Sequence, residues 1–256
     1  MMTIVKVSSD IKLKRRCLDY GECRGLSRSL RHHGTCALVG SSGILLNSSC
    51  GDDIDASDFV IRFNLSPQEG YTTDVGKKSS MMVLNTIMSL RIYEFLQGAG
   101  EGKLKEKDIQ KANNTILFFP KSTTHHLQRG KSFEQMLRRQ GLNVVVVMGV
   151  TAFHNDEMRR QAWDVLDKHH NSDDRPSTGL LLVEVAITFC DRIQVYGFYP
   201  FARDQQNRTV PYHYWDDVTS VNSVLKRKHT HNFAAEFEIL RTLHNNGVIE
   251  HRIGHC

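Results

Sequence analysis

The sequence lacks any apolar run of membrane-spanning length. Its longest run, residues 144–150, falls far short of the ~20 residues that a transmembrane helix needs. The first residues have no apolar core of signal-peptide length and no small-residue cleavage site. Only five prolines and 18 glycines occur, which excludes collagen-like and proline-rich architectures. No two cysteines are spaced as Cys-x-x-Cys, which disfavours zinc-ribbon and thioredoxin-type sites.

The residues that are present describe a globular protein. The chain has 256 residues, of which 40% are hydrophobic and 24% charged. This composition buries a core, excludes disorder as the main state, and suits one large domain or at most two small ones. The formal net charge is 33 − 28 = +5. Such a mild positive charge favours an anionic substrate and is too small to indicate nucleic-acid binding.

Short apolar runs alternate with helical patterns along the chain. The runs predict strands at 36–40, 59–61, 81–84, 116–119, 144–148 and 193–198, and the patterns predict helices at 44–46, 86–97, 132–140, 155–169 and 178–190. We therefore expect a single α/β domain over residues 35–256, with a mostly parallel twisted sheet flanked by helices. Residues 1–34 are expected to form a basic, stem-like arm.

Ligands of such sheets bind outside the carboxyl ends of the strands. The first candidate there is the turn Gly40-Ser41-Ser42-Gly43, whose backbone N–H groups could approach a phosphate. It matches neither the Gly-x-Gly-x-x-Gly nor the Walker pattern, so an ordinary tight turn is the favoured interpretation. The second candidate, Asn64, follows the next strand. Its amide could read a nucleotide, or it could simply be a turn residue.

Three further segments could carry chemistry. Ser177, Thr178 and Gly179 precede an apolar helix, where they could bind a phosphate or only cap the helix. His213 lies among aromatic residues and beside Asp216, and could donate a hydrogen bond to a phosphate. His231 opens the last helix, where a neutral histidine would suit a general base. Taken singly, each of these histidines is more often structural than catalytic.

The cysteines and glycosylation sequons leave further alternatives open. Six cysteines, at positions 17, 23, 36, 50, 190 and 256, allow 15 pairings, and the sequence alone does not choose among them. The sequons are Asn47-Ser-Ser, Asn113-Asn-Thr and Asn207-Arg-Thr. Such tripeptides are common by chance, so each could be glycosylated or not.

Four segments in this order resemble the motifs of the eukaryotic Golgi sialyltransferases. CALVGSSGILLNSSCGDDIDASDFVIRFN resembles the large sialyl motif, and RPSTGLLLVEVAITFCDRIQVYGFYPF resembles the small one. VPYHYWDD resembles the third motif, and His231 with Glu236 matches the His-x4-Glu of the very short motif. Cys50, Cys256 and the aromatic runs YGFYPF and PYHYWD resemble the α2,8-sialyltransferase branch.

The resemblance implies a Rossmann-like fold of the sialyltransferase GT-A type and an inverting transferase that needs no metal or other cofactor. Its donor substrate would be CMP-sialic acid, and its acceptor a sialylated glycoprotein or glycolipid extended through an α2,8 linkage. The implied donor-binding residues are Ser41, Ser42, Asn64, Ser177, Thr178, Gly179, Tyr199 and His213. His213 would contact the donor phosphate, and His231 would act as the general base. No nucleic-acid partner is implied.

The resemblance also implies the disulfides Cys36–Cys190 and Cys50–Cys256, and leaves Cys17 and Cys23 without an assigned partner. It places the protein in the Golgi lumen, held by a transmembrane anchor that the chain lacks. The sequence departs from the family at Ser41, where asparagine is usual, and at Tyr199, where tryptophan is usual in this branch. The alternatives are a catalytically degenerate binder of CMP or sialylated glycans and a sialyltransferase of another linkage. A dinucleotide-dependent oxidoreductase fits poorly, because the first turn lacks its third glycine.

Overall fold

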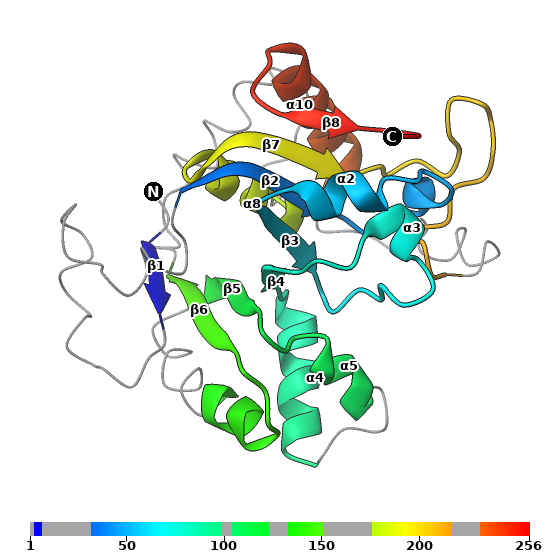
Figure 1. Ribbon diagram of the computed structural model, residues 1–256. Helices are drawn as coiled ribbons and strands as arrows, with labels where there is room; N and C mark the ends of the chain where they lie inside the picture. The colour runs from blue at the N-terminus through cyan, green and yellow to red at the C-terminus, as the bar shows by residue number, and fades with distance from the viewer. Residues whose placement is uncertain (1–2, 7–31, 99–103, 123–132, 151–175, 217–230) are drawn as a thin grey trace. The chain divides into compact units, whose positions relative to one another are not determined.

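The computed structural model describes residues 3–6, 32–98, 104–122, 133–150, 176–216 and 231–256 (Figure 1). The chain divides into two compact units whose segments alternate along the sequence. The first unit comprises Met1–His32, Ile61–Leu65 and Ser79–Phe153, and the second comprises His33–Val60, Ser66–Lys78 and His154–Cys256. No helix among the described residues is long and apolar enough to cross a membrane.

The first unit is built on strands in the order β1-β6-β5-β4-β3. The bounds are β1 Thr3–Lys6, β3 Phe59–Phe63, β4 Met81–Val83, β5 Ile116–Ser122 and β6 Val145–Val150. Neighbouring strands are parallel, except that β1 runs antiparallel to β6. Two helices, α4 Thr86–Leu96 and α5 Glu106–Gln110, and a further helix over 133–139 bury apolar residues against the strands. Strands buried in this way are rich in apolar residues, as β4 and residues 116–119 of β5 show.

The second unit contains three parallel strands in the order β2-β7-β8. The bounds are β2 His33–Val39, β7 Cys190–Tyr196 and β8 Glu250–Arg252. Its helices are the 3₁₀ helix η2 Gly43–Leu45, α2 Gly51–Ala56, α3 Thr72–Val75, α8 Thr178–Ile187 and α10 Phe233–Asn245. Its core includes the fully buried residues Ala37, Ile54, Val60 and Tyr196. This unit carries most of the candidate site residues.

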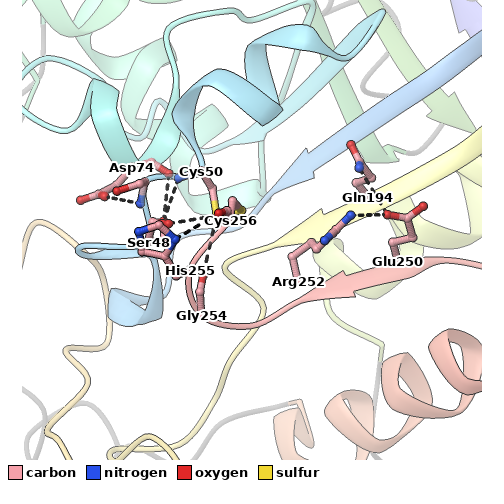
Figure 2. The surroundings of a disulfide bond; sticks show 10 residues. Ser48, Cys50, Asp74, Gln194, Glu250, Arg252, Gly254, His255 and Cys256 are labelled. Atoms are coloured by element: carbon pink, nitrogen blue, oxygen red, sulfur yellow. Dashed lines mark hydrogen bonds and ion pairs between the residues drawn. A yellow bond between two sulfur atoms is a disulfide. The ribbon is translucent and has the colours of Figure 1, made fainter.

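Two disulfides cross-link the second unit. Cys36 in β2 is bonded to Cys190 at the start of β7, with their Cα atoms 6.0 Å apart. Cys50 is bonded to Cys256 beside the turn that follows η2, and the N–H of Cys256 donates to the carbonyl of Ser48 at 2.9 Å (Figure 2). These are the two pairings that the family resemblance implies. Cys17 and Cys23 lie outside the described residues.

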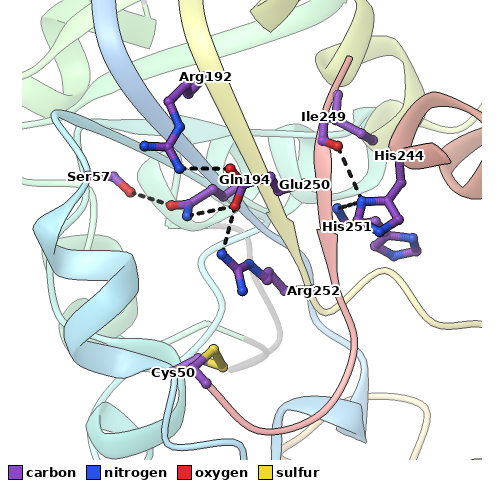
Figure 3. A network of polar contacts seen from close by, with 10 residues as sticks. Cys50, Ser57, Arg192, Gln194, His244, Ile249, Glu250, His251 and Arg252 are labelled. Atoms are coloured by element: carbon purple, nitrogen blue, oxygen red, sulfur yellow. Dashed lines mark hydrogen bonds and ion pairs between the residues drawn. A yellow bond between two sulfur atoms is a disulfide. The ribbon is translucent and has the colours of Figure 1, made fainter. Parts of the chain in front are cut away.

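Polar side chains hold the short strand β8 against β7. The carboxylate of Glu250 accepts hydrogen bonds from Arg192 at 2.8 Å, Gln194 at 3.3 Å and Arg252 at 2.7 Å (Figure 3). These hydrogen bonds, that of Arg192 first, lower the pKa of Glu250 to about 2. The carboxylate is therefore charged at neutral pH and pairs with both arginines.

The α/β class with mostly parallel strands is confirmed, and each predicted strand has a counterpart. The strand predicted to end before Pro120 instead continues to Ser122 as β5. The pairing register shifts between Phe119 and Ser122, and such an irregularity accommodates a proline without an N–H group. The predicted helix 178–190 ends earlier, at Ile187, because Cys190 already belongs to β7. The helix predicted at 155–169 and most of the predicted arm lie outside the described residues.

Candidate active site

The turn after β2 is fastened to the carboxyl end of β7. The N–H of Gly40 donates to the carbonyl of Tyr196 at 2.7 Å, and that of Ser42 donates to the carbonyl of Gly197 at 3.1 Å. A Cβ atom at Gly40 would collide with the Gly197 carbonyl, so only glycine allows this approach. The Ser42 hydroxyl caps η2 by accepting from the N–H of Ile44. Ser42 is thus committed to the tight turn, while Ser41 is half-buried.

The segment that carries His213 runs beside this turn. The N–H of Gly43 donates to the carbonyl of Pro211 at 3.0 Å, and the N–H of Tyr214 donates to the carbonyl of Ser41 at 2.9 Å. The Tyr214 hydroxyl donates to the carbonyl of Pro67. Backbone bonds on both sides of His213 therefore fix its position relative to the turn.

The imidazole of His213 is oriented by three neighbours. Its Nδ1 lies 2.7 Å from Oδ2 of Asp216, and its backbone N–H donates to the same oxygen at 3.2 Å. Trp215 stacks on the ring at a centroid distance of 4.5 Å and an angle of 4°, and Tyr212 packs edge-on at 4.5 Å. A carboxylate only accepts, so Nδ1 must carry the proton that it shares with Asp216. Nε2 is the ring nitrogen left to meet a ligand.

The amino-terminal end of α8 is closed by a carboxylate from α10. Ser177 is the N-cap, as predicted, and its hydroxyl accepts from the N–H of Leu180 at 3.1 Å. The Ser177 N–H donates to Oε1 of Glu236 at 2.7 Å, and its hydroxyl donates to Oε2 at 2.5 Å. Both residues are buried, with 8% and 6% of their surface exposed. A negative charge at a helix amino terminus is electrostatically favourable.

This arrangement divides the three predicted phosphate-binding residues. The hydroxyl of Ser177 is fully used by Glu236 and Leu180, which makes Ser177 a positioning residue. Within the part of the chain that the structure describes, the backbone N–H groups of Thr178 and Gly179 make no hydrogen bond. They are half-buried and stay available for an anion at the start of α8.

The ring of Phe198 packs between the turn and the start of α8. A Cβ atom at Gly179 would lie 2.6 Å from Cε1 of Phe198, and one at Gly40 would lie 2.9 Å from its Cδ2. Because both positions are glycine, the ring contacts the two backbones directly. This brings two candidate phosphate-binding segments onto opposite sides of one aromatic ring.

A buried histidine supports Phe198 from β8. Nε2 of His251 lies 3.1 Å from the carbonyl oxygen of Phe198, so Nε2 carries the proton and donates it. Among the described residues, Nδ1 of His251 has no hydrogen-bond partner. Burial lowers the pKa of His251 to about 4, which keeps the ring neutral at physiological pH.

His231 lies just before α10, next to its N-cap Asn232, whose side chain accepts from the N–H of Ala235 at 3.1 Å. The imidazole is half-buried and packs on Phe233 at a centroid distance of 5.7 Å. Glu236 on the same helix is bonded to Ser177, so the His-x4-Glu segment is tied to the start of α8. Four of the candidate segments thus gather at the carboxyl ends of β2 and β7.

A small hollow of about 10 Å³ adjoins the His213 segment. Its walls are Tyr199, Pro200, Phe201, Ala202, Val210, Pro211 and Tyr212. The Tyr199 hydroxyl donates to the carbonyl of Arg203 at 2.8 Å, and its ring packs edge-on against Phe201 at 5.2 Å. Tyr199 therefore lines this hollow with its ring, beside the histidine that could meet the donor phosphate.

Asn64 belongs to the first unit and forms a turn after β3. Its φ is 56°, a left-handed conformation that asparagine tolerates. Its Oδ1 accepts from the N–H of Asn85 at 3.0 Å, which leaves its amide NH₂ as the group for a ligand. The assignment of Asn64 to donor binding stays a prediction.

Sequence reasoning assigned no individual role to three residues that organise the site, Phe198, Trp215 and Glu236, although Glu236 belongs to the His-x4-Glu match. The sequence feature that could have identified Glu236 is its place as an acidic residue in the first turn of an amphipathic helix. A carboxylate there can accept hydrogen bonds at the amino terminus of a neighbouring helix as well as of its own. Phe198 and Trp215 carry no such signal, because their contacts depend on the tertiary structure. Among the described residues, no group of three or more His, Cys, Asp or Glu side chains could hold a metal ion.

Comparison with known proteins identifies the family. The model of glycosyltransferase family 29 (sialyltransferase) matches residues 21–248, most of the chain. The protein belongs to this sialyltransferase family. It is 30% identical over 223 residues to an alpha-N-acetylneuraminide alpha-2,8-sialyltransferase of Xenopus laevis, a match that covers 86% of this chain and 58% of the relative. The chain thus spans somewhat more than half the length of this curated relative.

Solved sialyltransferases share the fold. One is the crystal structure of a mammalian sialyltransferase, with a TM-score of 0.53, and another is a mammalian sialyltransferase in complex with Gal-beta-1-3GalNAc-ortho-nitrophenol, with a TM-score of 0.55. Each is 22% identical and covers 87% of this chain and 70% of its own. The prediction of a sialyltransferase-type α/β fold is confirmed.

Proposed function

We propose that the protein is an inverting glycosyltransferase that moves sialic acid from CMP-sialic acid to a sialylated glycan and forms an α2,8 linkage. The observation that carries the proposal is the convergence of four motif segments in the second unit. The Gly40–Gly43 turn, the start of α8, the His213 segment and the start of α10 are joined by direct contacts at the ends of β2 and β7.

The donor phosphate would bind at the start of α8. The N–H groups of Thr178 and Gly179 are unused donors among the described residues, and the helix dipole adds a partial positive charge there. Nε2 of His213 supplies a further donor once the imidazole is protonated, while Asp216 holds the other ring nitrogen. These groups stabilise the negative charge that develops on the phosphate as CMP departs.

The proposed transfer step involves only the donor, the acceptor and the side chain of His231. The bond between the anomeric carbon of sialic acid and the phosphate oxygen breaks, and its electron pair leaves with CMP. The acceptor hydroxyl attacks the anomeric carbon from the opposite face, and His231 takes the hydroxyl proton. Inversion of the anomeric configuration follows from this geometry. A general base of this kind contributes a factor of ~10²–10⁴ to the rate.

The acceptor would bind against the aromatic residues that surround the small hollow beside His213. Aromatic walls such as Tyr199, Phe201 and Tyr212 suit the apolar faces of sugar rings, and Phe201 is 41% exposed. The solved relative that holds a Gal-beta-1-3GalNAc compound is consistent with a short glycan as acceptor. The similarity to an alpha-2,8-sialyltransferase and the Cys50–Cys256 disulfide support the sialylated acceptor and its linkage.

The same proposal places the protein in the Golgi lumen. Disulfide bonds persist in oxidising compartments, and the structure contains two of them with buried sulfur atoms on Cys36, Cys50 and Cys190. Cys36 and Cys50, one from each disulfide, lie on either side of the segment that forms the first turn of the site.

The first experiment measures CMP release from CMP-sialic acid with and without a sialylated acceptor. Wild type should release CMP in an acceptor-dependent manner, and His231→Ala should lose that release by ~10²–10⁴-fold. CMP binding by His231→Ala, measured by calorimetry, should be unchanged because His231 acts on the acceptor. His255→Ala is the matched control, since this ring is exposed and, among the described residues, its hydrogen bond is to the carbonyl of Cys256.

If folded wild type binds CMP but releases none from CMP-sialic acid, the transferase proposal would be contradicted for that acceptor. Ser41→Asn then separates the alternatives. Restored turnover would mean that the first turn limits catalysis, and continued silence would favour a binding protein. Product analysis of an active enzyme would test the α2,8 linkage separately.

A further inference from the structure

The three glycosylation sequons differ in how far the fold exposes their side chains. Glycan transfer requires the side-chain amide of the asparagine and the hydroxyl two residues later to meet an enzyme at the surface. The two disulfides indicate that the folded chain passes through an oxidising secretory compartment, where this transfer takes place. The sequons can therefore be ranked by the exposure and contacts of these two side chains and by how closely other parts of the chain approach them.

The Asn113 sequon is built into the first unit. Oδ1 of Asn113 accepts from the N–H groups of Asn114 at 3.1 Å and Asn143 at 2.8 Å, which fixes the plane of its amide. The hydroxyl of Thr115 donates to the carbonyl of Ala112 at 2.7 Å, and Thr115 is only 5% exposed. Both reactive side chains of this sequon are committed to the fold.

The Asn47 sequon lies in a closed turn beside a disulfide. The N–H groups of Asn47 and Ser49 donate to the two carboxylate oxygens of Asp74, at 2.9 and 3.0 Å. Ser48 between them is buried, and its carbonyl accepts from the N–H of Cys256 (Figure 2). The side chains of Asn47 and Ser49 are both exposed, and this sequon differs from the others because the chain end crosses directly beside it.

The Asn207 sequon occupies a hairpin that leaves its side chains to solvent. The hairpin is closed by an antiparallel bridge between Arg203 and Thr209, and Asp204 accepts from the N–H of Gln206 at 2.9 Å and from that of Arg208 at 2.8 Å. The backbone of Asn207 is used on both sides, since its N–H donates to Asp204 and its carbonyl accepts from Arg203 at 2.7 Å.

The side chains of Asn207 and Thr209 are both exposed, and within the described residues neither makes a hydrogen bond. The φ of Asn207 is 61°, a left-handed conformation in which asparagine is favoured over most residues. The hairpin therefore presents an intact sequon on a backbone that needs neither side chain to hold its shape.

We propose that Asn207 carries an N-linked glycan in the mature protein. The hairpin joins Ala202 to Val210, and both of these residues line the hollow beside His213. The glycan would thus stand on the rim of this hollow. The modification depends only on the sequon, its exposure and the secretory compartment, and does not depend on the proposed catalytic activity.

The test expresses the 256-residue chain behind a cleavable secretion leader in eukaryotic cells and maps glycopeptides by mass spectrometry, before and after treatment with peptide N-glycosidase. The peptide that contains Asn207 should carry the glycan, and Thr209→Ala should lose one glycan and its gel mobility shift. Thr209→Ser, which keeps the sequon, should retain both. Asn207→Asp removes the glycan and keeps a residue that tolerates a positive φ.

Recovery of folded wild type with an unmodified Asn207 peptide would overturn the proposal. An unchanged glycan count in both Thr209→Ala and Asn207→Asp would do so too. Asn113→Asp is the comparison for the buried sequon, and it should leave the glycan pattern of folded protein unchanged. Thermal melting of every variant shows whether the secreted material is folded.

Discussion

The contact between Glu236 and Ser177 should make a large, measurable contribution to the free energy of unfolding. Glu236→Ala removes two hydrogen bonds to a buried carboxylate, at 2.7 and 2.5 Å. Hydrogen bonds to charged groups contribute about 1.5–3 kcal/mol each, so the loss should be ~3–6 kcal/mol. The substitution also leaves the N–H of Ser177 buried without its acceptor.

Ser177→Ala should cost less than Glu236→Ala. It removes the hydroxyl bond to Glu236 and the N-cap bond to Leu180 but keeps the bond from the backbone N–H to the carboxylate. Loss of an N-cap costs about 1 kcal/mol, and the charged bond adds about 1.5–3 kcal/mol. We expect a total of ~2–4 kcal/mol.

A double-mutant cycle isolates the bond between the two side chains. The sum of the single effects should exceed the effect of the double variant by ~1.5–3 kcal/mol, because the hydroxyl–carboxylate bond is counted in both singles. The free energies come from urea unfolding followed by circular dichroism. Glu238→Ala is the control on the same helix, since its exposed pair with Arg241 spans 3.5 Å and should contribute under ~0.5 kcal/mol.

A coupling energy below ~0.5 kcal/mol, the level found for independent sites, would refute this reasoning. It would mean that the bond between the Ser177 hydroxyl and the Glu236 carboxylate adds no net stability to the contact between α8 and α10. A coupling energy of ~1.5–3 kcal/mol, together with variants that bind the donor as tightly as wild type does, would give a different result. It would show that the contact between Glu236 and Ser177 stabilises the fold without positioning the start of α8.

Three further predictions concern stability. Cys256→Ser should lower the free energy of unfolding by ~2–5 kcal/mol, measured by denaturation without reductant. The control repeats the comparison in protein that carries Cys36→Ala and Cys190→Ala and so lacks the other disulfide. In that background, reduction with dithiothreitol should remove the difference between the proteins with and without Cys256→Ser. The pKa of His251 is lowered to about 4, so wild-type stability should fall as pH drops from 6.5 towards 4, by up to ~3 kcal/mol, and His251→Phe should flatten this fall; an equal fall in both would contradict the burial argument. The pKa of Glu250 is lowered to about 2, so its contribution should be present above pH 4.5 and be lost as pH falls towards 2. Because the group is partly exposed we expect at most ~1 kcal/mol, absent in Glu250→Gln.

The strands were predictable where burial dictates composition. β4 and β5 read as continuous apolar runs because both of their faces are covered, and a run of that kind has few other interpretations. β8 has the sequence Glu-His-Arg and shows no such pattern. It forms by pairing its backbone with β7, and Glu250 bonds to Arg192 of that strand, 58 positions away in the sequence. No local signal reports a partner at that distance.

The site shows the same division. Ser177 was predictable as a cap, since a serine before an apolar helix supplies the missing acceptor locally. That the same hydroxyl is taken up by Glu236, 59 positions later, is a tertiary fact. It moves Ser177 from phosphate binding to positioning and leaves the N–H groups of Thr178 and Gly179 as the donors. The sequence shows which residues are available, and the packing determines which of their atoms are left over.

The order of the bonded cysteines has a consequence for a chain that meets a protease. Cys36, Cys50, Cys190 and Cys256 alternate between the two bonds, so the loop closed by one bond overlaps the loop closed by the other. A single cut anywhere between Cys36 and Cys256 leaves its two fragments covalently linked, and a cut between Cys50 and Cys190 leaves them linked twice. A nicked molecule therefore stays in one piece until its disulfides are reduced. Its two fragments cannot diffuse apart, so they can fold back together after the cut.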